Sequence, residues 1–500
     1  MTLGLIDEGK TARPMKPRTK NDALDFEISV PLVIDLDLTL ISTDALHESL
    51  IMFLKRHPLE AWNIPLWLLQ GRAVLKRQLA QAVTDADAHG FPINADILTI
   101  AQREAALGRR VFLATGADIS IAQKMQRRLA FIEGVIASEN GVNLKGAAKA
   151  EKVSEMFPDG FIYAGDSSAD LHVWDKASAA LFVGSSASMA KKITSRTDLA
   201  AILPTQLLDF PTLRKGLRLH QWAKNALVFV PLILGGKASD PPAWLMALGG
   251  FVALSILASA TYLLNDLWDL TEDRLHWTKK NRPLASGRLQ ISTAMGVIAG
   301  GGLVAFGLAA ALGPRCVLAL LIYLALSLSY SFRLKREPMV DVVMLASMFT
   351  MRLAIGLVVT QVAFSPWLFV FSMFIFLSLS TAKRHTEIVR MVAHGMTATP
   401  GRGYRAGDAP LVLALGVGSM VATTLIMVIY LVQEAFPAHV YRHPAPLWGL
   451  PMIVFLWMAR IWLLCHRGEL NDDPVAFALK DKLSLGYGAA AVSLLAVALL

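Results

Sequence analysis

The sequence predicts a two-part protein: an α/β domain with a doubly wound sheet and a helical cap, followed by an all-α domain that crosses a membrane. Residues 1–210 mix charged and apolar side chains, whereas residues 225–500 contain repeated apolar runs. Several runs approach the ~20 residues that span hydrocarbon. A mean hydropathy of +0.48 over 500 residues is also high for one soluble domain. The chain is therefore expected to change its solvent near Pro211.

Charge and cysteine content narrow the class of function. The formal net charge is +9, but the basic residues lie in short loops between apolar runs, which favours lipid headgroups and phosphates over nucleic acid. Cys316 and Cys465 flank apolar segments far apart in sequence, so they predict neither a disulfide nor a thiolate metal site. The first residues, through Asn21, are polar and basic. We expect no cleaved signal peptide and an N-terminal domain in the cytoplasm.

The α/β domain is expected over residues 30–208, after a polar segment at 1–29. Three short apolar runs, 31–37, 111–115 and 161–166, end in polar residues and precede helical patterns. This alternation is typical of βαβ units, with a helical cap at about 41–105. Because the carboxyl ends of parallel strands meet at one sheet edge, the polar ends are expected to lie together.

The first run carries a phosphatase-like motif. Asp35 and Asp37 stand two residues apart after a strand, where one carboxylate can attack phosphorus and the other can move a proton. The later runs add further polar residues in order, namely Thr115, Lys145, Asp166 and Asp170. Together these motifs resemble the haloacid dehalogenase-like phosphatase superfamily over residues 30–190.

That resemblance assigns roles to the motif residues. It implies that Asp35 is the nucleophile, Asp37 the acid/base, and Thr115 and Lys145 the groups that bind phosphate and balance charge. It further implies Mg2+ held by Asp35 and Asp166, with Asp170 supporting the metal. The alternative is a degenerate domain with a purely structural role. The cap contains no motif that identifies the substrate.

About nine membrane spans are expected in residues 225–500, after an amphipathic interfacial linker at 209–224 that could instead be a plain solvated linker. The expected spans lie near 225–236, 244–264, 291–312, 316–332, 341–361, 364–381, 409–433, 446–465 and 483–500. Loops 265–290, 333–338, 383–405 and 466–482 are rich in basic residues. By the positive-inside rule they face the cytoplasm, in a cytoplasmic membrane.

The end of one span carries an acidic motif. Asn265, Asp269 and Asp273 are spaced by four, so on one helix they share a face and can offer oxygen ligands to Mg2+. The alternative is a solvated helix end. Lys279, Lys280 and Arg282 follow, and cations with Mg2+ suit a departing diphosphate. With Arg-Pro-Leu-Ala-Ser-Gly at 282–287, the motif resembles the UbiA superfamily of intramembrane prenyltransferases over residues 215–500. The resemblance implies that the three residues hold Mg2+ against a diphosphate.

A second aspartate-rich motif, usual in aromatic prenyltransferases of that superfamily, is missing from the equivalent place. The chain instead has Tyr330, Lys335 and the carboxylate of Asp341, with Arg352 on nearly the same helical face. One acid among cations suits a phosphate-rich donor. This pattern, with Lys224 earlier, is similar to the polyprenyl-phosphate phosphoribosyltransferase branch. Lys383 and Arg384 join the expected phosphate contacts, or are only positive-inside anchors.

Three functions remain open from the sequence. The favoured one is transfer of 5-phosphoribose from phosphoribosyl diphosphate to a polyprenyl phosphate such as decaprenyl phosphate, with Lys335 and Arg352 placing the phosphates. The second is prenyl transfer from a prenyl diphosphate to an aromatic acceptor. The third is a membrane scaffold or transporter in which only the phosphatase-like domain is an enzyme. Oligomeric state and lipid chain length are not readable.

Overall fold

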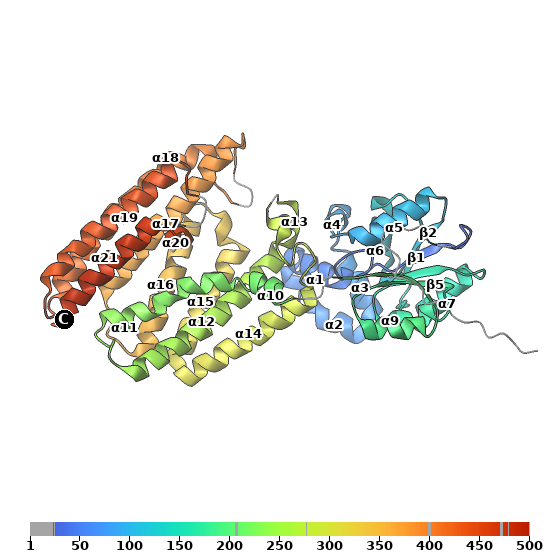
Figure 1. The fold of residues 1–500 in the computed structure, drawn as a ribbon, viewed down its shortest axis with the longest axis horizontal. Helices are drawn as coiled ribbons and strands as arrows, with labels where there is room; N and C mark the ends of the chain where they lie inside the picture. The colour runs from blue at the N-terminus through green and yellow to red at the C-terminus, as the bar shows by residue number, and fades with distance from the viewer. Residues whose placement is uncertain are drawn as a thin grey trace, which may run out of the picture. The chain divides into compact units, whose positions relative to one another are not determined.

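The computed structural model describes residues 24, 26–205, 209–276, 278–398, 402–470, 474–478 and 480–499. Most of the polar segment at 1–29 lies outside these residues. The chain forms two compact units, one made of residues 1–213 with 269–294 and the other of residues 214–268 with 295–500 (Figure 1). We call them the N-terminal unit and the membrane unit.

A six-stranded parallel sheet forms the centre of the N-terminal unit, in the order β3-β2-β1-β4-β5-β6. The strands are β1 (Leu32–Ile34), β2 (Val111–Asp118), β3 (Ile132–Ser138), β4 (Ile162–Gly165), β5 (Ala179–Val183) and β6 (Asp198–Leu203). The predicted doubly wound α/β fold is confirmed. The order reverses direction between β1 and β4, the place where such sheets bind ligands.

Helices cover both faces of this sheet (Figure 1). Leu32 and Ile34 of β1 pack into one apolar core, and Val33 between them packs into the other, as the alternation of side chains along a strand requires. The flanking elements are α6 (Ile119–Arg128), α7 (Ala147–Met156), η2 (Ser168–Asp170), α8 (Leu171–Trp174) and α9 (Ala187–Thr194).

The segment between β1 and β2 is helical, as expected of a cap. It contains α1 (Ala45–Arg56), η1 (Pro58–Glu60), α2 (Asn63–Gln70), α3 (Arg72–Ala80), α4 (Asp85–His89) and α5 (Ala95–Ala106). Asp44 begins α1 by accepting hydrogen bonds from the backbone N–H groups of Leu46 and His47. The cap therefore starts directly after the Asp35–Thr39 motif.

Eight helices in the described part of the chain are long and apolar enough to cross a membrane, so this is an integral, multi-pass membrane protein. They are α12 (Pro241–Trp268), α14 (Ile291–Leu312), α15 (Pro314–Phe332), α16 (Val340–Thr360), α17 (Pro366–Ala393), α18 (Ala409–Tyr430), α19 (Gly449–His466) and α21 (Lys482–Leu499). Their places match eight of the nine expected spans.

The ninth expected span, at 225–236, is wrong. That region forms a 3-10 helix, η3 (Leu219–Phe229), and the short α11 (Val230–Leu234), which has Pro231 in its first turn and ends before Gly235. Proline is favoured in the first turn of a helix and disfavoured in its interior, which agrees with a new element beginning at Val230.

Short elements connect the longer helices. They are α10 (Phe210–Gly216), α13 (Leu270–Leu275), η4 (Lys279–Asn281), η5 (Leu334–Arg336), η6 (Ala406–Asp408), η7 (Leu431–Ala435), η8 (Ala445–Trp448) and α20 (Pro474–Ala478). One close approach between elements requires a glycine. A Cβ at Gly356 of α16 would lie 2.1 Å from the carbonyl oxygen of Val228 in η3. Small residues permit such backbone contacts between membrane helices.

Candidate active sites

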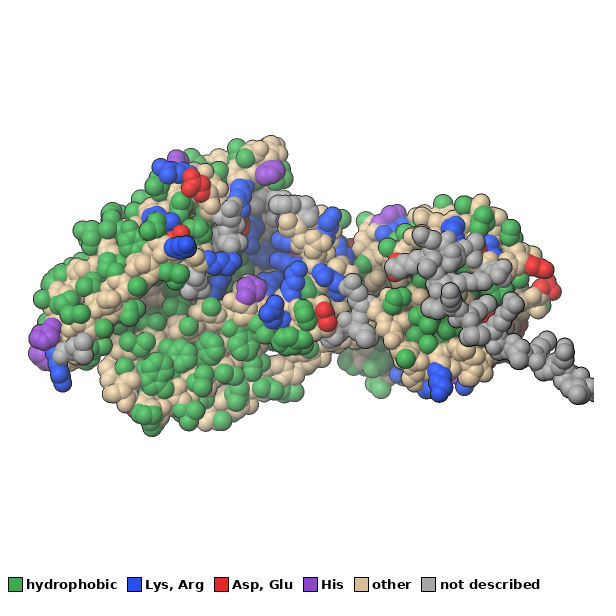
Figure 2. All heavy atoms as spheres, in the orientation of Figure 1, with side chains coloured by type: hydrophobic (Ala, Val, Ile, Leu, Met, Phe, Trp, Pro, Cys, Tyr) green, Lys and Arg blue, Asp and Glu red, His purple; other side chains and the backbone are tan. Residues whose placement is uncertain are grey.

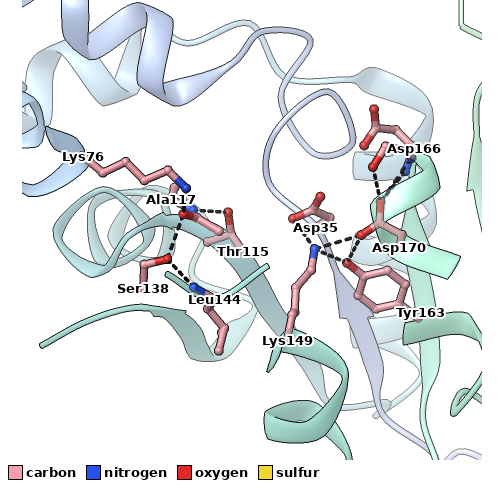
Figure 3. A network of polar contacts seen from close by, with 12 residues as sticks. Asp35, Lys76, Thr115, Ala117, Ser138, Leu144, Lys149, Tyr163, Asp166 and Asp170 are labelled. Atoms are coloured by element: carbon pink, nitrogen blue, oxygen red, sulfur yellow. Dashed lines mark hydrogen bonds and ion pairs between the residues drawn. The ribbon is translucent and has the colours of Figure 1, made fainter. Parts of the chain in front are cut away.

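Three carboxylates meet at the carboxyl edge of the sheet. Asp35 follows β1, Asp166 follows β4, and Asp170 ends η2, the short turn after β4. One oxygen from each lies within 4.8 Å of the others (Figure 3). The sequence predicted this gathering, because each polar residue was placed after a buried apolar run.

Lys149 of α7 lies among these acids (Figure 3). Its ammonium is 2.9 Å from Asp170 Oδ1 and 3.2 Å from Asp35 Oδ1, and it donates to the Tyr163 hydroxyl at 2.7 Å. The Tyr163 hydroxyl in turn donates to Asp170 Oδ1 at 2.9 Å. Burial alone would lower the pKa of Lys149, but the two carboxylates raise it well above its usual value. Lys149 therefore stays charged in the cluster.

The carboxylates of the site are not fully neutralised by this lysine. Burial raises the pKa of Asp35 to about 6 although Lys149 opposes the shift. Burial and the charges of Asp44 and Asp35 raise the pKa of Asp37 to about 7. Burial and the charges of Asp35 and Asp170 raise the pKa of Asp166 to about 8. The cluster thus has more acids than nearby cations can stabilise.

The donor set fits Mg2+, which prefers carboxylate oxygens. Asp35 Oδ1 is buried without a hydrogen bond in the described part of the chain, apart from its ion-pair contact with Lys149. Both oxygens of Asp170 are already engaged, Oδ1 by Lys149 and Oδ2 by the backbone N–H and hydroxyl of Ser167. Asp35 and Asp166 are accordingly the stronger candidates for direct ligands, with Asp170 as their support.

Asp37 is held by the start of the cap. Its Oδ1 accepts a hydrogen bond from the backbone N–H of Ala45, the first residue of α1, at 2.8 Å. Between Asp37 and Thr39, Leu38 has a φ of +57°, a conformation that costs free energy for a residue with a side chain. The Thr39 hydroxyl is buried without a hydrogen bond in the residues the structure describes. The motif loop is therefore tightly constrained.

A pocket of about 430 Å3 opens over this cluster, lined by the acids together with residues of the cap. Four basic residues line it, namely Arg72, Lys76, Lys145 and Lys149. From α3 of the cap, Lys76 donates to the Gly116 carbonyl at 2.5 Å and to Asn143 Oδ1 at 2.7 Å (Figure 3). Cap and sheet together thus enclose a cavity in which basic side chains lie beside the acidic cluster.

Two residues predicted to bind phosphate, Thr115 and Lys145, form no hydrogen bond or ion pair with Asp35 within the described residues 26–205. Thr115 is fully buried and its hydroxyl accepts from the Ala117 backbone N–H at 3.0 Å, while Gly116 and Ala117 line the pocket. Lys145 lines the pocket, but the lysine that contacts Asp35 is Lys149, one turn further on. In the sequence, Lys149 could be recognised only by its position in the helical pattern that follows Lys145.

The acidic motif at the end of α12 does not lie on one continuous helix as expected. The helix ends at Trp268, Asp269 has φ −92° and ψ 13°, and α13 begins at Leu270. The Asp273 N–H still donates to the Asp269 carbonyl at 2.8 Å, so these two residues remain one turn apart. Asp273 is buried and its Oδ2 pairs with Arg282 at 2.5 Å. The carboxylates of Asp269 and Asp273 are hard oxygen donors that fit Mg2+.

Asn265 belongs to the membrane unit, whereas Asp269 and Asp273 belong to the N-terminal unit. Within the membrane unit, the Lys335 ammonium donates to Asn265 Oδ1 at 3.4 Å, so these two predicted residues lie together. The neighbouring acid, Asp266, pairs with Arg218 at 2.5 Å. The fold of the membrane unit therefore places a cation beside Asn265, the first residue of the acidic motif.

Arg352 lies buried inside the membrane unit. Its Nε donates to Asn225 Oδ1 at 2.9 Å, and Asn225 donates in turn to the Ser255 hydroxyl at 2.9 Å. The guanidinium stacks over the ring of Phe349, which Lys224 also approaches, at 5.7 Å. The predicted phosphate ligands Lys224 and Arg352 thus share one aromatic neighbour.

Asp341 and Arg384, both predicted to bind substrate, bind each other. Arg384 Nε donates to Asp341 Oδ2 at 2.5 Å, and the Tyr404 hydroxyl donates to Asp341 Oδ1 at 2.6 Å. Arg402 lies 3.5 Å from Asp341 Oδ2 and donates to the Tyr330 hydroxyl at 2.9 Å. Both oxygens of Asp341 are occupied, which favours a structural role. Arg402 was missed in the sequence.

The remaining predicted cations are less enclosed. Lys279, Arg282 and Lys383 are half-buried, and Lys280 is exposed. On the face drawn in Figure 2, Lys and Arg side chains gather in a hollow, while the surface of the membrane unit's helices is largely hydrophobic.

Fold and sites together define a multi-pass membrane protein with a polar, cation-rich interior and an attached α/β unit that carries a carboxylate cluster. Residues 226–485 match the model of the UbiA prenyltransferase family. The chain belongs to this family.

Curated relatives cover different shares of the chain. The uncharacterised protein y4nM of Sinorhizobium fredii is 41% identical over 95% of this chain and 92% of its own length. Nodulation protein NoeC of Azorhizobium caulinodans is 30% identical over 56% of the chain and 90% of its own length. Decaprenyl-phosphate phosphoribosyltransferase of Mycobacterium tuberculosis is 35% identical over 35% of the chain and 59% of its own length. The y4nM similarity thus extends over nearly the whole chain.

Solved structures resemble part of the chain. A UbiA homologue from Archaeoglobus fulgidus, bound to DMAPP and Mg2+, aligns with a TM-score of 0.44 and 15% identity, over 57% of this chain and 97% of that protein. A UbiA homologue from Aeropyrum pernix aligns with a TM-score of 0.40 and 20% identity, over 55% of this chain.

Proposed function

We propose that the membrane unit transfers 5-phosphoribose from phosphoribosyl diphosphate to a polyprenyl phosphate. An oxygen of the lipid phosphate attacks the anomeric carbon of the ribose, the bond from that carbon to the diphosphate breaks, and pyrophosphate leaves. Asn265, Asp269 and Asp273 would hold Mg2+, which when bound supplies positive charge to the diphosphate oxygens. Lys279, Lys280 and Arg282 would neutralise the remaining charge of the leaving group.

One observation carries this proposal: residues 330–352, which stand where a second aspartate-rich motif would be expected, are mainly basic in their charged positions. Lys335 contacts Asn265, while the carboxylate of Asp341, at the start of α16, is occupied by Arg384 and Tyr404. A second metal clamp needs accessible carboxylates, whereas a donor and an acceptor that both carry phosphates need cations. The similarity to decaprenyl-phosphate phosphoribosyltransferases supports the same choice.

Several side chains have proposed roles toward the phosphates. Lys335 and Arg352 would place the two substrates, and Lys224, Tyr330 and Lys383 would contact phosphate oxygens. Arg384 and Asp341 would act indirectly, by fixing α16 against α17. The lipid chain would lie between helices whose outer surface is hydrophobic.

The decisive assay supplies purified protein with phosphoribosyl diphosphate, Mg2+ and a polyprenyl phosphate. We expect a lipid-linked pentose phosphate and free pyrophosphate, detected by mass spectrometry. A parallel reaction with a prenyl diphosphate and an aromatic acceptor tests prenyl transfer, the second candidate. A prenylated product in place of the pentose phosphate would reverse the assignment.

A scaffold or transporter role is tested by Asp269→Ala. Loss of a magnesium ligand is expected to lower the transferase rate by about 10²–10³-fold, as loss of charge stabilisation does elsewhere. Hydrolysis of a phosphate monoester by the same preparation serves as the internal control. A scaffold would keep its function without this carboxylate.

We propose further that residues 30–208 form a haloacid dehalogenase-like phosphatase domain. Asp35 attacks the phosphorus of a phosphate monoester, Asp37 gives its proton to the departing alkoxide, and Asp37 then takes a proton from the water that releases phosphate. A pKa of about 7 lets Asp37 hold that proton near neutral pH. Lys149, Lys145 and Thr115 would support the phosphate, and Asp35, Asp166 and Asp170 would hold Mg2+.

The two activities can act in sequence if residues 209–224 form an interfacial linker that keeps the phosphatase domain on the cytoplasmic surface of the cytoplasmic membrane. The transferase product carries a 5-phosphate, which is a monoester, and tethering raises its effective concentration at the phosphatase. An Asp35→Asn variant is expected to accumulate lipid-linked ribose phosphate. Unchanged turnover of that lipid would contradict the sequence of steps.

A further inference from the structure

The acidic loop, defined as residues 269–289, folds back on itself inside the N-terminal unit. Asp273 in its first half pairs with Arg282 in its second half. Arg274 Nε donates to the Ala285 carbonyl at 3.3 Å. The proposed metal ligands and the following basic segment are thus joined side by side.

The same loop is attached to helix α1 of the N-terminal unit. Arg274 makes a two-pronged contact with Glu48, in which NH2 donates to Oε1 at 2.6 Å and NH1 to Oε2 at 3.1 Å. Their side chains are 7% and 1% exposed. Glu48 also accepts from the Thr43 hydroxyl at 2.7 Å. Paired guanidinium and carboxylate planes fix orientation as well as distance.

Two further contacts secure the loop. Lys55, at the other end of α1, pairs with Glu272 at 3.0 Å. The backbone of Gly287 lies against Ser42, because a Cβ at Gly287 would be 2.7 Å from the Ser42 carbonyl oxygen. Gly287 also has a φ of +75°, which other residues adopt only with strain. Both halves of the acidic loop therefore contact the region around α1.

These contacts affect the proposed metal ligands because they hold α13, which contains Asp273. This helix has six residues, too few to be stable without tertiary contacts. Arg274 directly follows Asp273, so fixing the direction of Arg274 fixes the rotation of α13 and with it the direction of Asp273. A buried carboxylate such as Glu48 is costly unless it stays paired, so the contact resists opening.

We propose that Glu48 is a positioning residue of the transferase: through Arg274 it holds the acidic loop in the conformation that presents Asp269 and Asp273 to their ligand. This inference rests on the proposed transferase function. The first residue of α1, Ala45, binds Asp37, so one helix contacts the proposed metal loop of the transferase and the acid/base of the phosphatase. Within the N-terminal unit, helix α1 is accordingly shared by the acidic loop and the phosphatase-like motif.

The test compares Glu48→Gln with Glu133→Gln in the full-length protein. Glu133 also pairs with an arginine of the same domain, Arg110 at 2.8 Å, but that pair is exposed. For Glu48→Gln we expect the Mg2+ concentration that gives half-maximal transfer to rise about tenfold, the effect typical of losing a residue that orients metal ligands. Glu133→Gln is expected to match the unaltered protein.

A second readout does not depend on activity. Hydrogen–deuterium exchange of residues 270–275 and 284–289 is expected to speed up in Glu48→Gln, while strands β1 and β4 keep their protection and report that the domain is folded. Gly287→Ala disturbs a different contact of the same loop, the one between Gly287 and Ser42, without altering a charge, and is also expected to speed up exchange of these residues. The double variant Glu48→Arg with Arg274→Glu is expected to restore protection.

Unchanged exchange in both Glu48→Gln and Gly287→Ala would overturn the inference. So would an unchanged Mg2+ requirement in a protein whose loop exchange has become faster. If the unaltered protein transfers no phosphoribose at all, the proposed function fails instead, and the exchange data alone then decide whether Glu48 holds the loop.

Discussion

The two candidate sites differ in how their charges are balanced. At the sheet edge, Asp35, Asp166 and Asp170 surround a single lysine, Lys149. In the membrane unit, buried acids have direct partners, as in the pair of Asp341 with Arg384. A surplus of one charge can be relieved by a ligand of the opposite charge, whereas a matched pair is already stable. The first arrangement is the one we propose as a metal site, and the second favours a structural contact.

The largest expected effect concerns the acid/base of the sheet-edge site. Replacing Asp37 by Asn removes its proton transfer and should lower hydrolysis of a phosphate monoester by about 10²–10⁴-fold. The rate is measured by phosphate release from the full-length protein. The same substitution at the exposed Asp159 is the control. Equal rates for the two variants would mean that this cluster is not a phosphatase centre.

Much of the sheet-edge site could be predicted from the sequence. Asp35 and Asp166 directly follow buried apolar runs, and parallel strands bring such positions to one edge. Lys149 could not be chosen over Lys145 because the choice depends on where α7 begins. The helix starts at Ala147, so Lys145 precedes it and Lys149 lies in its first turn. A boundary error of two residues is enough to hide this difference.

The membrane unit was predictable in its spans but less so in its contacts. Length and hydropathy located eight helices, while the expected ninth span is divided between η3 and the short α11. The pairing of Asp341 with Arg384 joins residues 43 positions apart on two helices. It depends on the rotation of each helix about its axis, which an almost uniformly apolar sequence does not specify. The basic loops of the sequence indicated that the membrane unit contains cations, but not which residues these cations contact.

The second prediction concerns the buried ion pair of Asp341 with Arg384 in the membrane unit. Asp341→Leu leaves the Arg384 guanidinium without its buried partner and should lower the free energy of unfolding by about 3–5 kcal/mol. Adding Arg384→Met should recover much of that loss, because an apolar pair replaces an ionic pair of similar volume. Stability is followed by hydrogen exchange of α16 and α17 in detergent.

Transfer activity provides a second measurement on the same variants. If the pair is structural, transfer per folded molecule should be retained in the double variant wherever α16 and α17 regain protection. A well-protected double variant with no transfer would instead place Asp341 or Arg384 in contact with substrate. The exposed pair of Arg196 with Asp175 is the control, since breaking it should change little.

The third prediction concerns pH and the surplus of acid at the sheet edge. The pKa values of Asp35, Asp37 and Asp166 rise from 3.8 to about 6, 7 and 8 in the folded protein. The folded state then holds more protons than the unfolded chain between pH 4 and 8. Without metal, these three groups should therefore make the N-terminal unit less stable as pH rises from about 5 to 8.

Mg2+ should reverse that decline, because it binds the deprotonated carboxylates. At about 100 times its dissociation constant it should stabilise the folded state by about 2.7 kcal/mol. The stabilisation should be largest at pH 8 and weaken toward pH 5, where protons compete. Hydrogen exchange of β1 and β4, with and without Mg2+, measures it. Asp166→Asn removes one ligand and should lose most of the Mg2+ effect, whereas a Mg2+ effect that is equal at both pH values would place the ion away from these acids.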